Sequence, residues 1–302
     1  LNAGSIGDGT GSPDPFSIKE VTRPGGQDGY AGKQEVYAGY AMLDLPLVRW
    51  LRMVGGARLE ANRIRVEPFD VFGVAIDSKA NAQIKTLNVL PSLNLIFAAR
   101  KDMNVRLVGA ETVARPEFRE LAPFVFTDFA GGFTVQGYSK LTATKIWNAD
   151  LRWEWFPSAN EVIAVSGFIK QFDAPIERVI YSSATPLQTF TNTKSATNIG
   201  VEAEFRKNLE FIAKPLKDLS VGVNFAYIYS KVTLADDVKF DVSTSRTRPL
   251  EGQSPYVANA FIAYDNDKVG TNLRLLFNTY GKRIAFVGGM GLAGEDEQYR
   301  AL

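Results

Sequence analysis

The stretch KIWNADLRWEWF, residues 145–156, alternates between apolar and polar side chains. Every second residue from Trp147 to Trp155 is apolar, and the residues between them are Asn, Asp, Arg and Glu. A period of two is the pattern of a β-strand whose two faces lie in different surroundings. One face of this strand holds three of the four tryptophans of the chain, and the other carries charges of both signs. The fold must therefore give its sheet one apolar and one polar environment.

The same alternation recurs along the chain. We expect strands near residues 34–45, 50–63, 84–98, 103–115, 141–156, 161–172, 196–206, 219–230, 255–264 and 270–280. These segments are longer than the usual strand of about five or six residues in a globular protein. A tilted strand that crosses a bilayer needs about nine to eleven residues, which these lengths allow.

Short and long connections alternate between these segments. The short ones are residues 46–49, 99–102, 157–160 and 265–268, with a somewhat longer one at 207–218. The long polar ones are residues 1–33, 64–83, 116–140, 173–195 and 231–254. In an up-and-down barrel this alternation places all short turns at one end, as in outer-membrane barrels with short periplasmic turns and long external loops.

These patterns predict an all-β fold, a transmembrane antiparallel up-and-down β-barrel. Its apolar face would point to lipid and its charged face into a water-filled lumen. The aromatic girdle at the membrane interface is predicted to include Trp155, Tyr227, Tyr229 and Tyr264. Periodicity alone leaves one alternative, a soluble β-sandwich in which each strand buries one face.

Composition excludes several kinds of chemistry. The chain has 302 residues and contains neither cysteine nor histidine. Disulfides, thiolate or imidazole metal sites, cysteine nucleophiles and histidine-based triads are therefore impossible within it. The net charge of +1 gives no reason to expect a nucleic-acid partner. We predict no catalytic residue, no cofactor and no metal site, so the chain is not expected to be an enzyme.

Several motifs follow one another in a recognisable order. They are TVARPEFRELAPF (112–124), NADLRWEWFPSANEVIAVSGFIK (148–170), FIKQFDAPIERVI (168–180) and RPLEGQSPYVANAFIAYD (248–265). Together they resemble the C-terminal half of the β-barrel of TonB-dependent outer-membrane receptors, over most of residues 34–290. One departure is GYSKL (137–141), where that family often has Gly-Asn-Pro before the leucine.

The resemblance implies a 22-stranded barrel that encloses an N-terminal plug domain, in the Gram-negative outer membrane. Ten strands cannot close to that width, because barrel diameter grows with strand number. Residues 1–302 are therefore interpreted as the C-terminal part of the barrel, strands 12 to 21, with the plug domain and the last strand absent from this chain.

The resemblance also implies a function and a set of partners. Receptors of this family take up a scarce solute, such as a siderophore-type chelate, a cobalamin, a glycan or a peptide, through the plugged barrel. The implied partners are the lipid bilayer, the plug domain of the same protein, a TonB-type energy-coupling complex that acts on the plug, and the solute or an envelope protein. The alternative is an autonomous ten-stranded outer-membrane protein, either an enzyme or a structural subunit of an envelope complex.

Two groups of charged residues are candidates for facing the lumen, the plug or a ligand. The first, near the end of a predicted strand, is Arg115, Glu117, Arg119 and Glu120. The second, on predicted strands, is Arg152, Glu154, Glu202, Glu204 and Arg206. The structural alternatives are a salt-bridge cluster that braces the rim, for the first group, and a merely solvated lumen wall, for the second.

Overall fold

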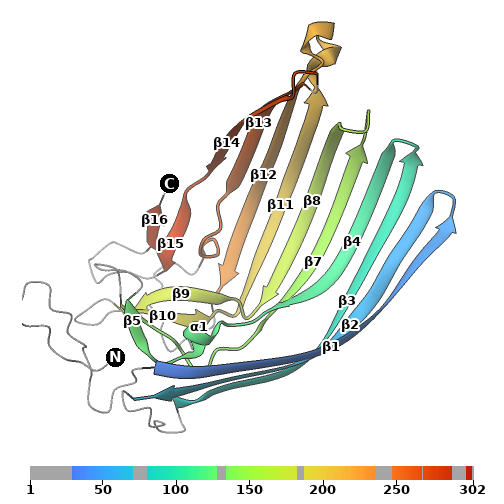
Figure 1. Cartoon of the computed structure of the whole chain (residues 1–302). Coiled ribbons are helices and arrows are strands. Elements are labelled where there is room, and N and C mark those ends of the chain that lie inside the picture. Colours follow the sequence, from blue (N-terminus) through green and yellow to red (C-terminus); the bar gives the residue numbers. More distant parts are fainter. Residues whose placement is uncertain are drawn as a thin grey trace, which may run out of the picture.

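The computed structural model describes residues 29–70, 80–127, 134–181, 187–234, 247–266, 268–287 and 297–300. Its main element is one sheet of ten antiparallel strands that pair in the order of the sequence (Figure 1). The strands are β1 (Gly29–Val48), β2 (Leu51–Phe69), β3 (Ala82–Arg100), β4 (Met103–Ala114), β7 (Thr144–Trp155), β8 (Val162–Asp173), β11 (Ser195–Asn208), β12 (Leu219–Thr233), β13 (Tyr256–Asn266) and β14 (Thr271–Tyr280). Each predicted segment is one strand of this sheet, and the predicted antiparallel up-and-down arrangement is confirmed.

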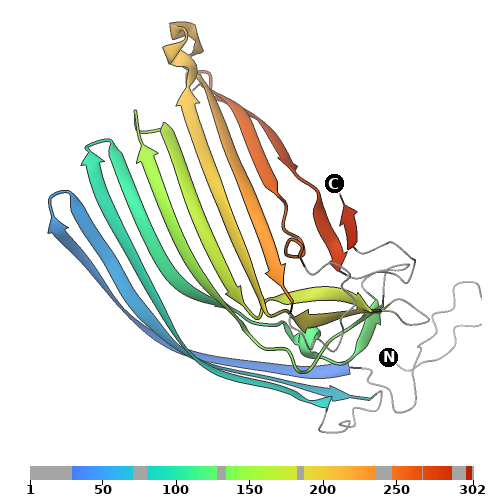
Figure 2. The ribbon, with the colours of Figure 1, turned by 180° about the vertical axis from the view of Figure 1, so that it is seen from behind.

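The connections divide between the two ends of the sheet as predicted (Figures 1 and 2). The short ones lie together at one end, where residues 209–218 carry the short helices η2 (Leu209–Phe211) and η3 (Lys214–Leu216). The first turn lies later than expected, because β1 continues to Val48 with an irregular register between Pro46 and Val48. In the described part of the chain β1 is an edge strand, and an edge strand tolerates a proline that donates no hydrogen bond. No helix among the described residues is long and apolar enough to cross a membrane.

The sheet divides between β3 and β4 towards the end with the long connections. The β3 strand pairs with β2 from Ala82 to Phe97, but with β4 only from Ser92 to Arg100. The pairing of β3 with β4 stops at Ser92, and the residue directly before it is Pro91. A proline has no N–H to donate to a ladder. Beyond this point β1, β2 and β3 continue as a three-stranded extension that sweeps away from the remaining strands (Figures 1 and 2).

A second sheet and a short helix occupy the same end of the molecule. The second sheet has six strands in the order β16-β15-β9-β10-β6-β5, with β6 parallel to β10 and β9 parallel to β15. The elements are α1 (Phe118–Leu121), β5 (Val125–Thr127), β6 (Thr134–Gln136), β9 (Ile176–Tyr181), β10 (Leu187–Asn192), β15 (Arg283–Val287) and β16 (Glu297–Arg300). Residues 116–140 and 173–195 were predicted to be long loops, and the strands β5, β6, β9 and β10 within them were missed because they have only three to six residues, too few to show a period.

The main hydrophobic core lies between the three-stranded extension and these elements. Ile64 and Val66 of β2 and Ile84 of β3 are buried against Leu121 of α1 and Phe190 of β10. All three strand residues belong to the face that is polar in the rest of the sheet. The extension therefore changes the character of its inner face where it leaves the ten-stranded wall, and this change holds the second sheet in place.

Candidate functional site

The register of the ten-stranded sheet separates an outer from an inner face. Trp147 and Leu151 of β7 are 53% and 54% exposed and belong to the outer face. Arg152 and Glu154 point to the inner face, on which α1 and the second sheet lie (Figure 1). The predicted division into an apolar and a charged face is therefore present across the sheet, and the candidate site is on the inner face.

A chain of ion pairs crosses the inner face from β4 to β11. Arg152 lies 2.9 Å from the Glu154 carboxylate and 2.6 Å from the Glu204 carboxylate. Glu154 is also 2.8 Å from Arg106, and Glu204 is 4.0 Å from Arg206. Four of the five predicted wall residues thus form one network, which we call the wall network: Arg106, Arg152, Glu154, Glu204 and Arg206.

A small residue on β8 allows this network to form. Ala164 is the direct cross-strand partner of both Glu154 and Glu204, and it is 1% exposed. Because its side chain is a single methyl group, the long side chain of Arg152 can pass over β8 to reach Glu204. The fifth predicted residue, Glu202, stays outside the ion pairs and accepts a hydrogen bond of 3.4 Å from the Ser166 hydroxyl.

Arg106 is the member of the wall network that sequence reasoning missed. It lies on the polar side of β4, where Asn104 and Arg106 alternate with apolar residues. The same period that identified Arg152 could have found it. The carboxylate that it binds, Glu154, is 9% exposed in its side chain and needs both neighbouring guanidinium groups to offset its desolvation.

The first predicted group does not form a single cluster. Arg115, just beyond β4, forms an ion pair with Glu60 of β2, which is also bound by Arg58 at 2.9 Å. Arg115 thereby bridges the division between β3 and β4, beyond the last paired residues Ser92 and Ala110. Glu60 is buried, and no sequence pattern singled it out.

Of the other three residues of that group, Arg119 and Glu120 belong to α1 and Glu117 is the N-cap residue directly before it. The Glu120 carboxylate accepts a hydrogen bond of 2.9 Å from the backbone N–H of Glu117, which caps the start of the helix. Burial raises the pKa of Glu120 above its usual value. The guanidinium of Arg119 lies 4.6 Å from the centre of the Phe126 ring. These contacts fix the helix on the second sheet.

A buried ion pair joins two motifs that are far apart in the sequence. Glu177 of β9 and Arg248 have side chains that are 0% and 2% exposed, and two hydrogen bonds of 2.7 and 2.8 Å connect them. The backbone N–H of Glu251 donates a third hydrogen bond, of 3.0 Å, to the Glu177 carboxylate. The backbone N–H of Arg178 in turn donates to Glu251 at 2.6 Å. Burial raises the pKa of Glu251 to about 7.

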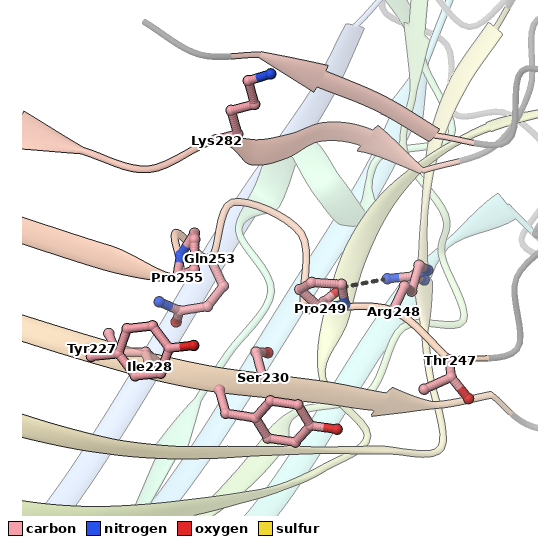
Figure 3. A pocket seen from close by; sticks show the side chains of 10 residues that line it. Tyr227, Ile228, Ser230, Thr247, Arg248, Pro249, Gln253, Pro255 and Lys282 are labelled. Atoms are coloured by element: carbon pink, nitrogen blue, oxygen red, sulfur yellow. Dashed lines mark hydrogen bonds between the residues drawn. The ribbon is translucent and has the colours of Figure 1, made fainter.

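Next to this ion pair, a cavity of about 350 Å³ separates β12 from residues 247–255 (Figure 3). The segment is held to β12 by hydrogen bonds from the backbone N–H of Ile228 to the carbonyl of Pro255 and from the N–H of Leu250 to the Ser230 hydroxyl. The rings of Tyr227 and Tyr229 contribute to the lining, which is mainly apolar. Among the residues described, no group of three or more acidic side chains is arranged to hold a metal ion.

Comparison with known proteins identifies the wall. A family model described as "TonB dependent receptor-like, beta-barrel" matches residues 3–297. The chain belongs to this family. The resemblance in the sequence motifs is thereby confirmed for the barrel, and the ten-stranded sheet is part of the wall of a TonB-dependent receptor barrel. Comparison with curated protein sequences found no match.

Solved structures of this receptor family have the same fold at low sequence identity. The chain is similar to the copper transporter OprC, with a TM-score of 0.61 and 15% identity over 89% of this chain and 38% of that one. It is also similar to the ferric yersiniabactin uptake receptor FyuA from Yersinia pestis, with a TM-score of 0.55 and 17% identity over 84% and 35%. A third similar structure is the siderophore receptor PirA from Acinetobacter baumannii. Its TM-score is 0.54 and its sequence identity 14%, over 90% of this chain and 47% of PirA. The chain therefore spans less than half the length of each of these proteins.

Proposed function

We propose that this wall belongs to a TonB-dependent transporter of the Gram-negative outer membrane, which takes up a scarce solute through a plugged barrel. The observation that carries the proposal is the two-faced sheet. Its outer face exposes apolar side chains on strand after strand, and its inner face carries the wall network. Such a sheet suits a barrel with lipid outside and a polar interior.

The wall network gives the barrel interior fixed charges. Arg152 is shared by two carboxylates, so its guanidinium is held in one position rather than free to move. Glu202, which is exposed and forms no ion pair with the described residues of the wall, offers an acceptor to whatever fills the lumen. We infer that a plug domain packs against this surface and that a TonB-type complex acts on the plug to open a path for the solute.

The solute is proposed to be an organic molecule or a chelate rather than a bare metal ion. The chain has no histidine or cysteine, so it offers no imidazole or thiolate to hold copper or zinc, and its sulfur ligands are limited to the thioethers of four methionines. The similar structures are named for copper, ferric yersiniabactin and siderophores. Siderophore-type chelates, cobalamins, glycans and peptides remain the candidate classes.

The test is uptake by cells that contain or lack the whole protein. Each candidate solute would be supplied in limiting amount, with and without a protonophore that collapses the proton gradient across the inner membrane. Energy-dependent uptake of one solute only in cells that have the protein is the expected result. Uptake that ignores the protonophore would indicate a passive channel, and no uptake of any candidate would favour a structural role in an envelope complex.

A further inference from the structure

The outer face of the three-stranded extension changes abruptly from apolar to charged. Along β2 the outward residues are uncharged from Leu51 to Ala61, and they become Arg63, Arg65 and Glu67 immediately after. Eleven residues at about 3.3 Å each, tilted by about 40°, cover a height of roughly 25 Å, which is the height of the apolar band of an outer-membrane barrel. The charges therefore begin where the hydrocarbon ends.

Strand register assembles these charges into two rows across β1, β2 and β3. Tyr37, Ala61 and Leu87 form the last apolar row, in which Tyr37 and Leu87 are 72% and 70% exposed. The next two rows consist of Glu35, Arg63 and Lys85, and then of Lys33, Arg65 and Gln83. Alternate residues of β2 and β3 are exposed here, while the residues between them are buried in the core. We call the four cations the basic patch: Lys33, Arg63, Arg65 and Lys85.

The patch has more positive charge than its own carboxylates neutralise. Lys33 pairs with Glu35 at 2.8 Å, and Arg65 lies 3.6 Å from Glu67. Arg63 and Lys85 have no ion pair among the residues that the structure describes. They are direct cross-strand partners, and like charges in that position repel each other. Glu35 of β1 stands opposite Arg63 on its other side, but this carboxylate is already paired with Lys33. An anion placed between them would relieve this repulsion.

The ends of β7 and β8 show a different arrangement at this level. On β7 and β8, for example, Lys145 stands directly opposite Asp173, so that the outward charges are balanced within the sheet. An excess of positive charge is thus not a feature of every strand end.

We propose that the basic patch binds the phosphate group of an anionic lipid headgroup in the leaflet that meets the long connections. Each headgroup layer is about 5–7 Å thick, and the two rows lie roughly 5 and 10 Å above the last apolar row. A lipid whose acyl chains contact the apolar band therefore brings its phosphate to the height of Arg63 and Lys85. Guanidinium groups bind phosphate oxygens in pairs, which favours a phosphate over a diffuse negative charge. The proposal does not depend on which solute, if any, the barrel transports.

The test compares lipid retention by variants of the whole protein in its folded, detergent-solubilised state. The protein would be equilibrated with mixed micelles that contain either phosphatidic acid or phosphatidylcholine, and bound lipid would be counted by native mass spectrometry. The double variant Arg63→Gln/Lys85→Gln removes the two unpaired cations at exposed positions. Lys145→Gln is the matched control, because Lys145 and Asp173 balance each other one to one, whereas the basic patch has four cations beside the two carboxylates Glu35 and Glu67.

Retention of phosphatidic acid by the unmodified protein and by Lys145→Gln, with about 30-fold weaker binding by the double variant, is expected from a loss of about 1 kcal/mol for each cation. Phosphatidylcholine should bind weakly to all three proteins. Equal retention of phosphatidic acid by the double variant would overturn the proposal. So would an equal loss in Lys145→Gln, or complete competition by inorganic phosphate, since the acyl chains would then contribute nothing.

Discussion

The carboxylate of Glu177 and the guanidinium of Arg248, which lie 71 residues apart in the chain, form a fully buried two-hydrogen-bond pair. Glu177 belongs to β9 of the second sheet, and Arg248 belongs to the segment 247–255, where its carbonyl accepts a hydrogen bond from the N–H of Val232 in β12. The pair therefore fastens the second sheet to the ten-stranded wall. The two sequence motifs that contain these residues, APIE and RPLEG, come together in the structure at this point.

Replacing Arg248 by methionine should loosen this attachment. The Glu177 carboxylate would remain buried without its partner, at a cost of about 3–5 kcal/mol. Hydrogen exchange of the β9 amides in the detergent-solubilised protein would report the change as faster local opening. The control is Arg178→Met, because Arg178 places its guanidinium 5.6 Å from the centre of the Phe190 ring and should lose about 1 kcal/mol. Equal effects of the two variants would contradict the role assigned to the ion pair.

The attachment of residues 247–255 should also depend on pH. Burial raises the pKa of Glu251 from 4.5 to about 7, so the attached segment binds the proton more tightly than the detached one. The protonated Glu251 side chain therefore stabilises the attached segment. This stabilisation is fully present below pH 4.5 and is lost as the pH rises to about 7. Exchange of the Arg178 amide, corrected for its intrinsic rate, should therefore become faster across this interval. The side chain of the Glu251→Gln variant is neutral at every pH, so exchange in this variant should not depend on pH over this interval. If the variant kept the pH dependence of the unmodified protein, Glu251 would be excluded as its cause.

Within the wall network, an arginine that is shared by two carboxylates should contribute more to the free energy of unfolding than one at the edge of the network. Arg152→Met removes the shared partner of Glu154 and Glu204, and we expect a loss of about 1–3 kcal/mol in the free energy of unfolding. Arg206→Met removes only a long contact of an exposed side chain, and should cost less than about 1 kcal/mol. Denaturant unfolding of the whole protein in micelles, followed by tryptophan fluorescence, compares the two. A larger effect of Arg206→Met would show that the network is not centred on Arg152.

Gly137 should be intolerant of any side chain. A methyl group there would overlap the backbone carbonyl oxygens of Arg119 and Ala122 at the end of α1. Gly137→Ala must push the helix away, at a cost of about 1–3 kcal/mol, and should weaken the hydrogen bond of 2.6 Å from the Tyr138 N–H to the carbonyl of Glu120. Hydrogen exchange of the Tyr138 amide, which should become faster, measures the weakening of this bond. Gly109→Ala is the control, because no atom lies within 4 Å of the position that its methyl group would take.

The wall could be predicted from the sequence because its signal is local. Each strand of the ten-stranded sheet carries its own period of two, so Arg152 and Glu154 were assigned to the polar face without knowledge of their neighbours. The partners of these charges were harder to find. Glu60 and Arg106 lie on the polar faces of other strands, and only the register shows that they meet Arg115 and Glu154.

The second sheet left almost no local signal. Strands such as β5 and β6 have three residues each, which is too short for a period to be recognised. Their stability comes from contacts with distant segments, for example from the packing of Val135 and Leu121 beneath Ile64. The inner face of β2 also changes from polar to apolar at Ile64, and this change could have indicated that something covers the strand there.

The second sheet draws its strands from three separate connections of the barrel. The segment after β4 carries β6, which pairs with β10 of the segment between β8 and β11. That middle segment also carries β9, which pairs with β10 and with β15 of the segment after β14. A shift of the middle segment therefore strains its bonds to both of the others, and a shift of either outer segment strains its bonds to the middle one. The described parts of these three connections are thus mechanically coupled, and a displacement of one outer segment can reach the other only through β9 and β10.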